Sequence, residues 1–409
     1  MPTTVQDRST RLSIPPVPVL SLAAFAGQGD AGDAADLPSL LDGADVRLVS
    51  SGRIAIGLAL GALGVGPGDI VLVPAYHSLS MIPPILWHGA SASFYRIHPD
   101  TTADLEDIGV RLAAGGVRAL IATHFFGIPQ ELSALRVLCE RHGVGLIEDC
   151  AHCFFGERNG VTIGSTGDFA IGSSMKFFPI YEGGCLVSRR RSLDVTLRRG
   201  GPGFEAKAAL SAFETSFAYG RLPGMRVALS LPLRLKSLLW NALKSRAGAG
   251  APVPALAPAS SDSAFEFDPY WLDKRSSIFS RFVLAHASRQ RIVTLRRRHY
   301  LALQSALDGV PGWRPLWPVL PDGACPWVFP LRAECTDAVV ERLKEAGIPV
   351  VRFGATLWPG VDAAVCANSA ALGRQLIGLP CHQDLSAGEL AAMIAAVRAA
   401  LQASTLQTA

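Results

Sequence analysis

The chain has 409 residues, of which 49% are hydrophobic and 18% are charged, and its formal net charge is +4. With a mean hydropathy of +0.29, this composition excludes a disordered or strongly acidic chain. The length predicts an α/β protein with one large or two domains, and no apolar run reaches the roughly 18–20 residues that a membrane-spanning helix needs.

The N-terminal segment predicts a cytoplasmic protein. Residues 1–12 contain Asp7, Arg8 and Arg11, with no apolar stretch followed by a small-residue cleavage site. Up to about residue 35 the chain is rich in Pro, Gly and Ala, and we expect it to lie over the surface.

From residue 46 to residue 147, short apolar segments alternate with helical ones. We expect strands at 46–50, 69–74, 92–97, 119–123 and 144–147, and helices at 54–63, 81–88, 102–114 and 131–142. This alternation is typical of parallel βαβ units, whose ligand site lies at the carboxyl ends of the strands.

The following segment predicts a hairpin and two more strands. After them the alternation of strands and helices ends. Asn159-Gly160 is a hairpin turn signal, and strands are expected at 167–171 and 184–188. Within 203–268 we expect an amphipathic helix at 231–245 and a flexible linker at 247–263.

The C-terminal part predicts a smaller domain. We expect a long helix at 276–307, strands at 327–331 and 348–351, and helices at 337–346 and 386–402, the last with a capping box from Ser386 to Glu389. The predicted domains are 36–290, with an insertion at about 203–268, and 291–409, joined by residues 1–35.

Positive charge is concentrated in the middle of the chain. Residues 189–298 hold 20 Lys and Arg against 7 Asp and Glu, whereas the remainder holds 18 against 27. Such a segment can bind nucleic acid or an anionic membrane, or it can form solvated helix faces. We favour the solvated faces and expect no nucleic-acid partner.

Eight cysteines are scattered without a repeating frame, and Cys150 and Cys153 form a lone CxxC. Redox chemistry and metal binding are possible for such a pair. Small apolar residues at a strand end in a reducing compartment are the favoured interpretation, so we expect no metal.

Residues 146–188 carry the strongest chemical signal. Asp149 follows an apolar strand directly, His152 lies three residues further on, and Lys176 lies in a loop before Gly183-Gly184. An acid at a strand end and a lysine in a later loop suit pyridoxal 5'-phosphate (PLP): the lysine forms the Schiff base, and the carboxylate keeps the pyridine nitrogen protonated.

Several motifs in a set order resemble the DegT/StrS-type sugar aminotransferases, and the chain is identified as a divergent member of that family. These motifs are Ser51-Gly52, Val73-Pro74, His124-Phe125-Phe126-Gly127, Ile147-Glu148-Asp149-Cys150-Ala151-His152, Gly164-x-x-Gly167-Asp168, Lys176 and Glu182-Gly183-Gly184. The resemblance implies fold-type-I architecture: a mostly parallel seven-stranded sheet flanked by helices, plus a smaller α+β C-terminal domain.

The resemblance also implies an activity and roles for individual residues. It implies transfer of an amino group from an amino acid, glutamate by preference, to a keto sugar linked to a nucleotide, in a homodimer with shared active sites. Lys176 would form the Schiff base and move a proton, Asp149 would pair with the pyridine nitrogen, and His152 would lie near the ring oxygen of the cofactor.

The phosphate of the cofactor would bind at the start of the helix predicted after Ser51. Ser51, Gly52 and Arg53 offer backbone N–H groups and the helix dipole there. The family commonly has threonine in place of Arg53, so its side chain can pair with the phosphate or point away; we favour the backbone contacts. Ser173 keeps the family's spacing after Gly167-Asp168, with Ser174 as the fallback ligand.

Other positions depart from the family. The aromatic ring that covers the cofactor aligns with Ser78, so we expect Tyr76 or His77 to take its place. No asparagine stands in the 273–275 region, where the family draws one from the partner subunit. Residues 217–246 are basic and amphipathic, and they can contact a membrane, cover the active site or extend the dimer.

Two rival hypotheses stay open. One keeps the cofactor but changes the reaction or the substrate, for example to a lipid-linked or other non-sugar ketone. The other is a non-catalytic regulatory or membrane-adaptor protein with a PLP fold.

Overall fold

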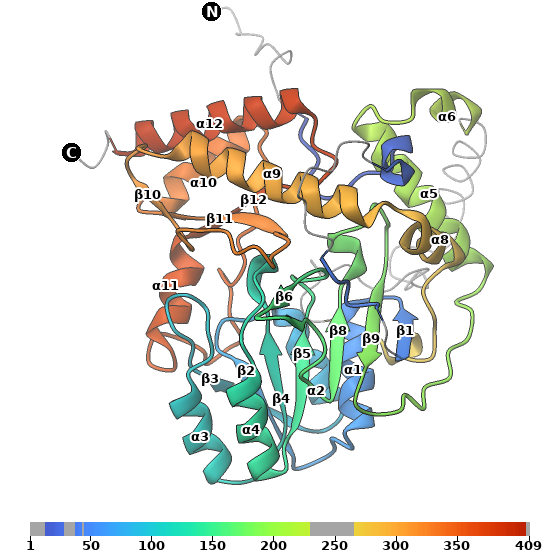
Figure 1. Ribbon diagram of the computed structural model, residues 1–409, viewed down its shortest axis with the longest axis vertical. Helices are drawn as coiled ribbons and strands as arrows, with labels where there is room; N and C mark the ends of the chain where they lie inside the picture. Colours follow the sequence, from blue (N-terminus) through green and yellow to red (C-terminus); the bar gives the residue numbers. More distant parts are fainter. Residues whose placement is uncertain (1–12, 28–36, 43–44, 230–265, 406–409) are drawn as a thin grey trace, which may run out of the picture.

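The computed structural model describes residues 13–27, 37–42, 45–229 and 266–405. Its centre is a seven-stranded sheet with the order β1-β9-β8-β5-β4-β2-β3 (Figure 1). In chain order the strands are β1 (Asp45–Val49), β2 (Ile70–Pro74), β3 (Ser91–Tyr95), β4 (Val117–Thr123), β5 (Gly145–Asp149), β8 (Phe169–Gly172) and β9 (Gly184–Ser188). Only β9 pairs antiparallel with its neighbours β8 and β1, so the predicted mostly parallel sheet is confirmed.

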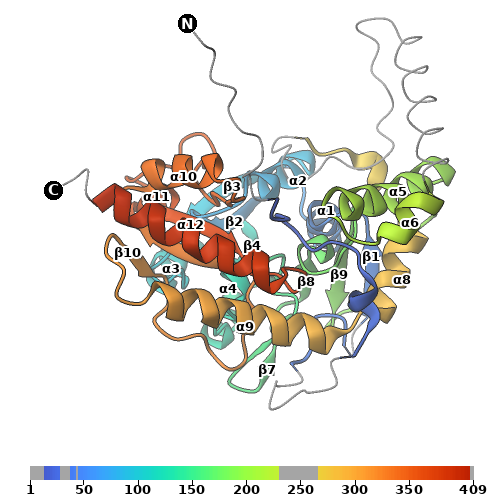
Figure 2. The same cartoon turned by 90° about the horizontal axis from the view of Figure 1, so that it is seen from above.

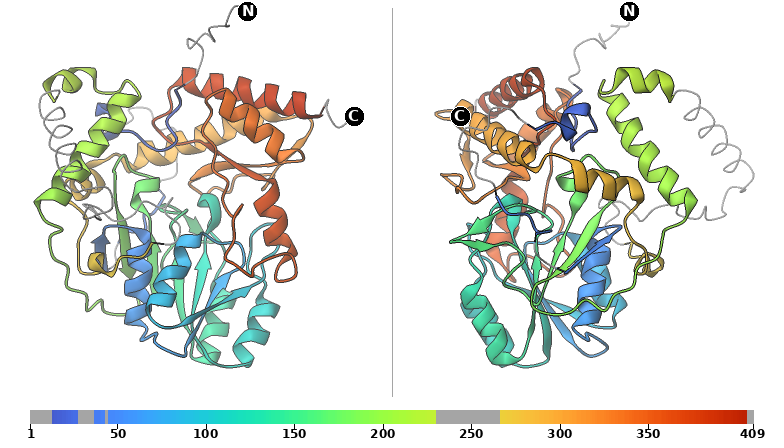
Figure 3. Two further views of the ribbon diagram at one scale, coloured as in Figure 1. Left: turned by 180° about the vertical axis from the view of Figure 1, so that it is seen from behind. Right: turned by 45° about the vertical axis from the view of Figure 1, so that its right-hand side comes forward.

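Helices cover both faces of this sheet, as Figure 1 and the reverse view in Figure 3 show. One face packs against α1 (Gly52–Ala62) and α2 (Ile82–Trp87), and the other packs against α3 (Leu105–Ala113) and α4 (Ser133–His142). This is the layered arrangement that alternating βαβ units produce, so the expected helices and strands between residues 46 and 147 are confirmed.

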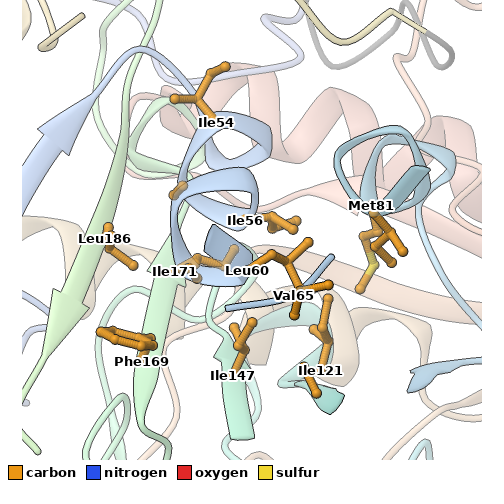
Figure 4. Packing of buried hydrophobic residues seen from close by; sticks show 14 of the residues in the cluster. Ile54, Ile56, Leu60, Val65, Met81, Ile121, Ile147, Phe169, Ile171 and Leu186 are labelled. Carbon is orange, nitrogen blue, oxygen red and sulfur yellow. The ribbon is translucent and has the colours of Figure 1, made fainter. Parts of the chain in front are cut away.

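The helix α1 makes the densest contact with the sheet. Figure 4 shows α1 beside β8 and β9, with a cluster of buried side chains that includes Ile54, Ile56, Leu60, Phe169, Ile171 and Leu186. Small residues on the helix, among them Ala55 and Ala59, let its backbone approach the strands closely, and both are fully buried. Each large side chain buried here stabilises the fold by roughly 1.5–3 kcal/mol, so the N-terminus of α1 is held rigidly at the ends of β8 and β9.

A second unit follows in the chain. A three-stranded antiparallel sheet has the order β10-β11-β12 and packs with four helices. Its elements are α9 (Arg289–Leu307), β10 (Trp313–Pro315), β11 (Val328–Ala333), α10 (Thr336–Glu345), α11 (Ala367–Gln375), β12 (Leu376–Pro380) and α12 (Ala387–Thr405). Seen from above in Figure 2, α9 and α12 run side by side over this sheet.

The N-terminal segment 13–27 lies against this second unit. The imidazole Nε2 of His382 donates to the carbonyl of Pro15 over 2.9 Å, and the amide of Ser288 donates to the carbonyl of Ala24 over 2.9 Å. The short helix η2 (Leu22–Phe25) ends the segment. We refer to residues 13–27 as the N-terminal strap.

Two expectations for the C-terminal half are wrong. The helix expected over 276–307 is divided into α8 (Ile278–His286) and α9, because Ala287 is extended and the hydroxyl of Ser288 accepts from the amide of Arg291 to cap a new helix. The strand expected at 348–351 is reduced to one bridge between Val351 and Gly378. The capping box of α12 is confirmed by the reciprocal bonds of Ser386 and Glu389.

The region around the expected insertion holds helices that the sequence patterns missed. These are α5 (Pro202–Ala218), α6 (Pro223–Ala228) and the short η6 (Pro269–Trp271). The helix expected at 231–245 and the linker at 247–263 lie outside the described residues. The expected hairpin is present as β6 (Glu157–Arg158) and β7 (Val161–Thr162), with positive φ at both turn residues, Asn159 and Gly160.

Candidate active site

A cavity of about 210 Å³ opens at the carboxyl ends of β4, β5 and β8. Its walls come from the sheet, the N-terminus of α1, the N-terminal strap and α5. The residues predicted from sequence that line it are Ser51, Gly52, Arg53, Asp149, His152, Ser173 and Lys176. Tyr76 and His77 do not line it.

Asp149 stands at the end of β5 and is 4% exposed. Its Oδ1 accepts from the amide of Ala151 over 2.9 Å, and its Oδ2 accepts from the hydroxyl of Thr123 over 3.3 Å. Burial raises the pKa of this carboxyl, although these two bonds and the charge of Lys176 oppose the shift. A cation placed against Asp149 would therefore be strongly stabilising.

Lys176 ends the short helix η5 (Ser174–Lys176), which follows β8. Its Nζ lies 4.5 Å from the centre of the Trp327 ring, a distance at which an ammonium is attracted to the face of an indole. Its backbone carbonyl accepts from the guanidinium of Arg296 over 2.8 Å. The predicted lysine therefore lies in the same cavity as the predicted carboxylate.

His152 lines the cavity and lies between aromatic rings. Its imidazole stacks on Trp327 at 4.0 Å between centroids and meets the edge of Phe353 at 4.7 Å. Burial, and then the charge of Lys176, holds the pKa of His152 well below its ordinary value, so the ring is neutral. Among the described residues its buried Nδ1 has no hydrogen-bond partner, which leaves this atom available to a bound molecule.

The N-terminus of α1 has the geometry of an anion-binding site. Ser51 is extended and its hydroxyl caps the amide of Ile54 at 3.3 Å, so the amides of Gly52 and Arg53 precede the first intrahelical bond, from Ala55 to Ser51. A Cβ at Gly52 would lie 3.5 Å from that of Ser173, which brings the serine to the same end of the helix.

The side chain of Arg53 is directed to the chain that precedes η6. Its guanidinium donates to the backbone carbonyl of Glu266. Burial lowers the pKa of Arg53, and the nearby carboxylate of Glu266 opposes that shift. The side chain of Arg53 was expected either to pair with the phosphate or to point away and leave the contact to its backbone amide. The contact with Glu266 favours the second role.

Tyr76 and His77 have structural roles instead of the expected one of covering the cofactor ring. The hydroxyl of Tyr76 donates to the carbonyl of Phe353 over 2.9 Å. The Nε2 of His77 accepts from the amide of Trp358 over 3.1 Å, and its Nδ1 therefore donates to the carbonyls of Pro74 and Ala75. Both rings are fully buried against other parts of the fold, and Ser78, Ser80 and Phe353 line the cavity on this side.

Several cavity residues were not found by sequence reasoning. They include Val17, Pro18, Val19 and Leu20 of the strap, Met81, Met175, Pro179, Ile180 and Tyr181, Ala212 and Thr215 of α5, and Phe353. Most of them are apolar and carry no motif. No local signal could have placed the strap or α5 beside Asp149, because both reach the cavity through tertiary packing.

Glu182 holds the start of α8 against the cavity. Its carboxylate accepts from the amide of Ser277 at 3.0 Å and from the hydroxyls of Ser277 and Ser276 at 2.8 and 3.0 Å. Burial raises the pKa of this carboxyl, and the serine bonds act against that shift. Glu182 thus fixes the segment where the family resemblance implied a contribution from a partner subunit.

The CxxC pair is structural. Cys150 and Cys153 are fully buried, and burial raises the pKa of both thiols well above the ordinary value, so they are protonated and unreactive. His124, Glu148 and Cys150 offer atoms within 4.8 Å of one another, but His124 accepts from the amide of Gln130 at Nδ1 and donates to Glu148 from Nε2. Its two nitrogens are already bonded.

Solved structures of aminotransferases share this fold. The apo form of a putative sugar aminotransferase, Spr1654 from Streptococcus pneumoniae, matches with a TM-score of 0.62 and 18% identity, covering 89% of this chain and 88% of that one. The aminotransferase TlmJ from Streptoalloteichus hindustanus matches with a TM-score of 0.59 and 21% identity, covering 88% and 86%. The fold is therefore that of the fold-type-I PLP-dependent transferases.

Sequence comparison gives a match over part of the chain. Residues 40–201 match the model of the DegT/DnrJ/EryC1/StrS aminotransferase family.

Curated relatives share only part of their length with the chain. A UDP-N-acetyl-3-dehydro-alpha-D-glucosamine 3-aminotransferase from Acidithiobacillus ferrooxidans is 31% identical over 36% of this chain and 41% of its own length. A dTDP-3-amino-3,4,6-trideoxy-alpha-D-glucose transaminase from Streptomyces venezuelae is 31% identical over 54% and 60%. Among the described residues, no helix combines the length and apolar character needed to cross a membrane.

Proposed function

We propose that this protein is a PLP-dependent aminotransferase that transfers an amino group from an amino acid to a keto sugar. The observation that carries this proposal is the convergence of Lys176, Asp149 and the N-terminus of α1 on one cavity. These three groups match the three parts of the cofactor, which are its aldehyde, its pyridine nitrogen and its phosphate.

The residues present fit this cofactor on independent grounds. The buried carboxyl of Asp149 has a raised pKa and would gain from a cationic partner, which a protonated pyridine nitrogen provides. The Nδ1 of His152 is buried without a partner among the described residues and would gain a hydrogen bond from a ring substituent. The amides of Gly52 and Arg53 and the hydroxyl of Ser173 would hold the phosphate.

When bound, pyridoxal phosphate supplies an electron sink that makes the Cα proton of an amino acid removable. The carboxyl of Asp149 would pair with the ring nitrogen, and the Nδ1 of His152 would hold the orientation of the ring through a hydrogen bond. The amine of Lys176 takes and returns the proton at the substrate carbon as a general base and acid. The strap and α5 exclude water from these groups.

The names of the relatives support nucleotide-linked keto sugars as the acceptors. They include two aminotransferases whose names specify UDP- and dTDP-linked sugars, and a GDP-perosamine synthase. We propose glutamate as the donor, on the resemblance alone. A cytoplasmic location stays a prediction, and so does the division of the chain at about residue 290, close to the start of α9.

The cofactor is tested with the purified full-length chain. We expect a visible absorbance band of bound PLP, and borohydride should attach the cofactor to Lys176. The Lys176→Ala variant should lose both signals. A colourless protein that takes up no PLP would refute the proposal. Adding glutamate should then convert the bound cofactor to its amine form, and a keto sugar nucleotide should restore it.

The composition of the cavity favours a second candidate acceptor. Its lining includes the apolar side chains of Val17, Val19 and Leu20 of the strap and of Met81 and Ile180. An acceptor with an apolar portion, such as a lipid-linked ketone, would bury that portion there. A panel of ketones offered to the amine form of the enzyme separates the two acceptors by their rates.

We also propose that the enzyme is a homodimer and that α8 contributes to the interface. Ile278 and Phe282 of this helix are 50% and 52% exposed. The ring centroid of Phe282 lies 6.0 Å from that of Phe25, whose ring is partly exposed. Light scattering should give twice the mass of the chain, and the Phe282→Arg variant should give the mass of a single chain.

The membrane contact suggested for residues 217–246 is tested by flotation with anionic vesicles.

A further inference from the structure

The backbone around Lys176 is bound by two side chains from distant parts of the chain. The guanidinium Nη2 of Arg296, in α9, donates to the carbonyl of Lys176 over 2.8 Å. The amide Nε2 of Gln383, after β12, donates to the carbonyl of Phe177 over 2.8 Å. The two side chains are joined by a bond of 2.9 Å from Arg296 Nε to Gln383 Oε1. We refer to Arg296 and Gln383 as the brace.

The same guanidinium also holds the aromatic ring beneath the lysine. Its Nη1 donates to the carbonyls of Pro326 and Trp327 over 3.0 and 3.1 Å. The indole of Trp327 lies 4.5 Å from Lys176 Nζ and stacks on His152. One side chain therefore fixes both the main chain of the lysine and the surface on which its ammonium rests.

The charged side chain of Arg296 is costly to bury, and its hydrogen bonds to several acceptors offset that cost. It is 0% exposed, and its hydrogen bonds go to carbonyl and amide oxygens, with its guanidinium 4.5 Å from the ring of Phe177. Burying such a charge costs several kcal/mol, which these bonds must offset. The planar fork of an arginine can address acceptors on several sides at once, whereas the single ammonium of a lysine cannot.

The helix η5 needs this external support. It has three residues, and the carbonyls of Lys176 and Phe177 lie at its C-terminal end, beyond its own hydrogen bonds to Ser173 and Ser174. A lysine that moves a proton needs a fixed backbone while its amine changes partners, because a displacement of about 1 Å can cost on the order of 10²-fold in rate.

We infer that Arg296, together with Gln383, is a positioning residue for Lys176, acting through the backbone of η5 and through Trp327. This inference rests on the proposed function. It links the C-terminal unit to the reacting lysine, because Gln383 and Trp327 flank the strands β12 and β11 of that unit.

The test compares Arg296→Met with Arg297→Met in the full chain. Arg297 is the adjacent residue of α9 and donates to the carbonyls of Pro321, Asp322 and Ala324 at 2.8, 3.0 and 2.7 Å. Its loss removes a comparable set of bonds away from Lys176. The readouts are hydrogen exchange of the Phe177 and Phe178 amides and the rate at which added PLP is trapped on Lys176 by borohydride.

For Arg296→Met we expect exchange at these amides about tenfold faster and trapping about tenfold slower than for Arg297→Met, the factor that one charge-assisted hydrogen bond represents. In the loaded enzyme, kcat should fall more than KM rises. Equal exchange and trapping in the two variants would overturn the inference.

A second variant covers the case in which Arg296→Met does not fold. Gln383→Met removes the bonds to Phe177 and to Arg296 Nε but keeps the bond from the guanidinium to Lys176, so we expect a smaller change in the same direction. No change in Gln383→Met would then overturn the inference. The hydrogen exchange needs no cofactor, so a wild-type chain that traps no PLP would refute the proposed function, while unchanged exchange would refute the brace.

Discussion

At the scale of single residues, burial decides which polar groups can act on a ligand. Asp149, His152 and Glu182 are all buried beside the cavity, but only Glu182 is saturated by its own neighbours, the serines at the start of α8. The carboxyl of Asp149 and the imidazole of His152 are less fully bonded, which is typical of groups that complete their hydrogen bonding with a ligand.

Asp149→Asn should weaken cofactor binding and lower kcat by a factor on the order of 10²–10³, since it removes the charge that stabilises the protonated ring nitrogen. Fluorescence titration with PLP and single-turnover rates with glutamate measure the two effects. Thr123→Val is the matched control, because it removes only the 3.3 Å bond to the same carboxylate. If Asp149→Asn behaves like this control, the role assigned to Asp149 is wrong.

At the scale of elements, the N-terminus of α1 depends on close packing against β9. A Cβ at Gly184 would lie 2.3 Å from the carbonyl carbon of Ser51, too close for any side chain. The family motif Glu182-Gly183-Gly184 therefore has a steric reason: the second glycine lets the helix start reach the strand.

Gly184→Ala should lower stability by about 1–3 kcal/mol, the usual cost of overpacking, and should weaken the binding of PLP. Urea unfolding and PLP titration measure these changes. Gly109→Ala, in α3 where a Cβ meets nothing within 4 Å, should be neutral or should stabilise by about 0.5–1 kcal/mol. Normal PLP binding by Gly184→Ala would contradict the assignment of this helix end.

Arg221, in the loop that follows α5, ties this region to the C-terminal unit. The guanidinium Nη2 of Arg221 donates to both carboxylate oxygens of Glu389 at 2.9 and 2.7 Å and to the carbonyl of Asp384 at 3.0 Å. Because Ala212 and Thr215 of α5 line the cavity, this tie holds one wall of it in place.

Arg221→Met should raise KM for the keto acceptor several-fold and leave PLP affinity unchanged, because α5 lines the cavity without contacting the groups assigned to the cofactor. Steady-state kinetics with the acceptor and PLP titration separate these effects. Arg190→Met, which removes a surface contact to Glu140, is the control and should change neither value. An unchanged KM in Arg221→Met would show that α5 does not shape the acceptor site.

At the scale of the whole molecule, two buried histidines join distant segments. The Nε2 of His77 accepts a hydrogen bond from the amide of Trp358, and the Nε2 of His382 donates one to the carbonyl of Pro15 in the strap. Burial lowers the pKa of His77 to about 4 and that of His382 to about 3, with their backbone hydrogen bonds opposing the shift.

Stability should therefore fall as the pH decreases below about 6.5. The unfolded chain binds a proton at each histidine near that pH, whereas the folded chain does not until about pH 4 and 3. In this window each histidine lowers the free energy of unfolding by up to about 1.4 kcal/mol per pH unit. Urea unfolding at pH 7.5, 6.5, 6.0 and 5.5 measures it, with these values chosen about the unperturbed histidine pKa.

The control for this pH dependence is His382→Gln, whose amide can still donate to Pro15. The free energy of unfolding of this variant should decline less steeply with decreasing pH than that of the wild type. The difference in slope should correspond to at most one proton taken up on unfolding. Equal slopes for the two proteins would mean that His382 does not stay neutral in the folded chain.

Local patterns in the sequence account for much of the fold. Hydrophobic period and turn residues predicted the order of strands and helices up to β9. The spacing of Asp149 and Lys176 relative to their strands predicted that both would reach one edge of the sheet, because parallel strands bring their carboxyl ends together.

The groups that surround Asp149 and Lys176 follow from packing between distant segments. Arg296, Trp327 and Gln383 lie 120 or more positions from Lys176 along the chain, and the strap reaches the cavity from the other end of the sequence. Tyr76 and His77 were expected in the site because their neighbours in sequence are there, yet their rings are drawn into bonds with Phe353 and Trp358. The orientation of a ring depends on packing between distant segments, and local spacing carries no information about it.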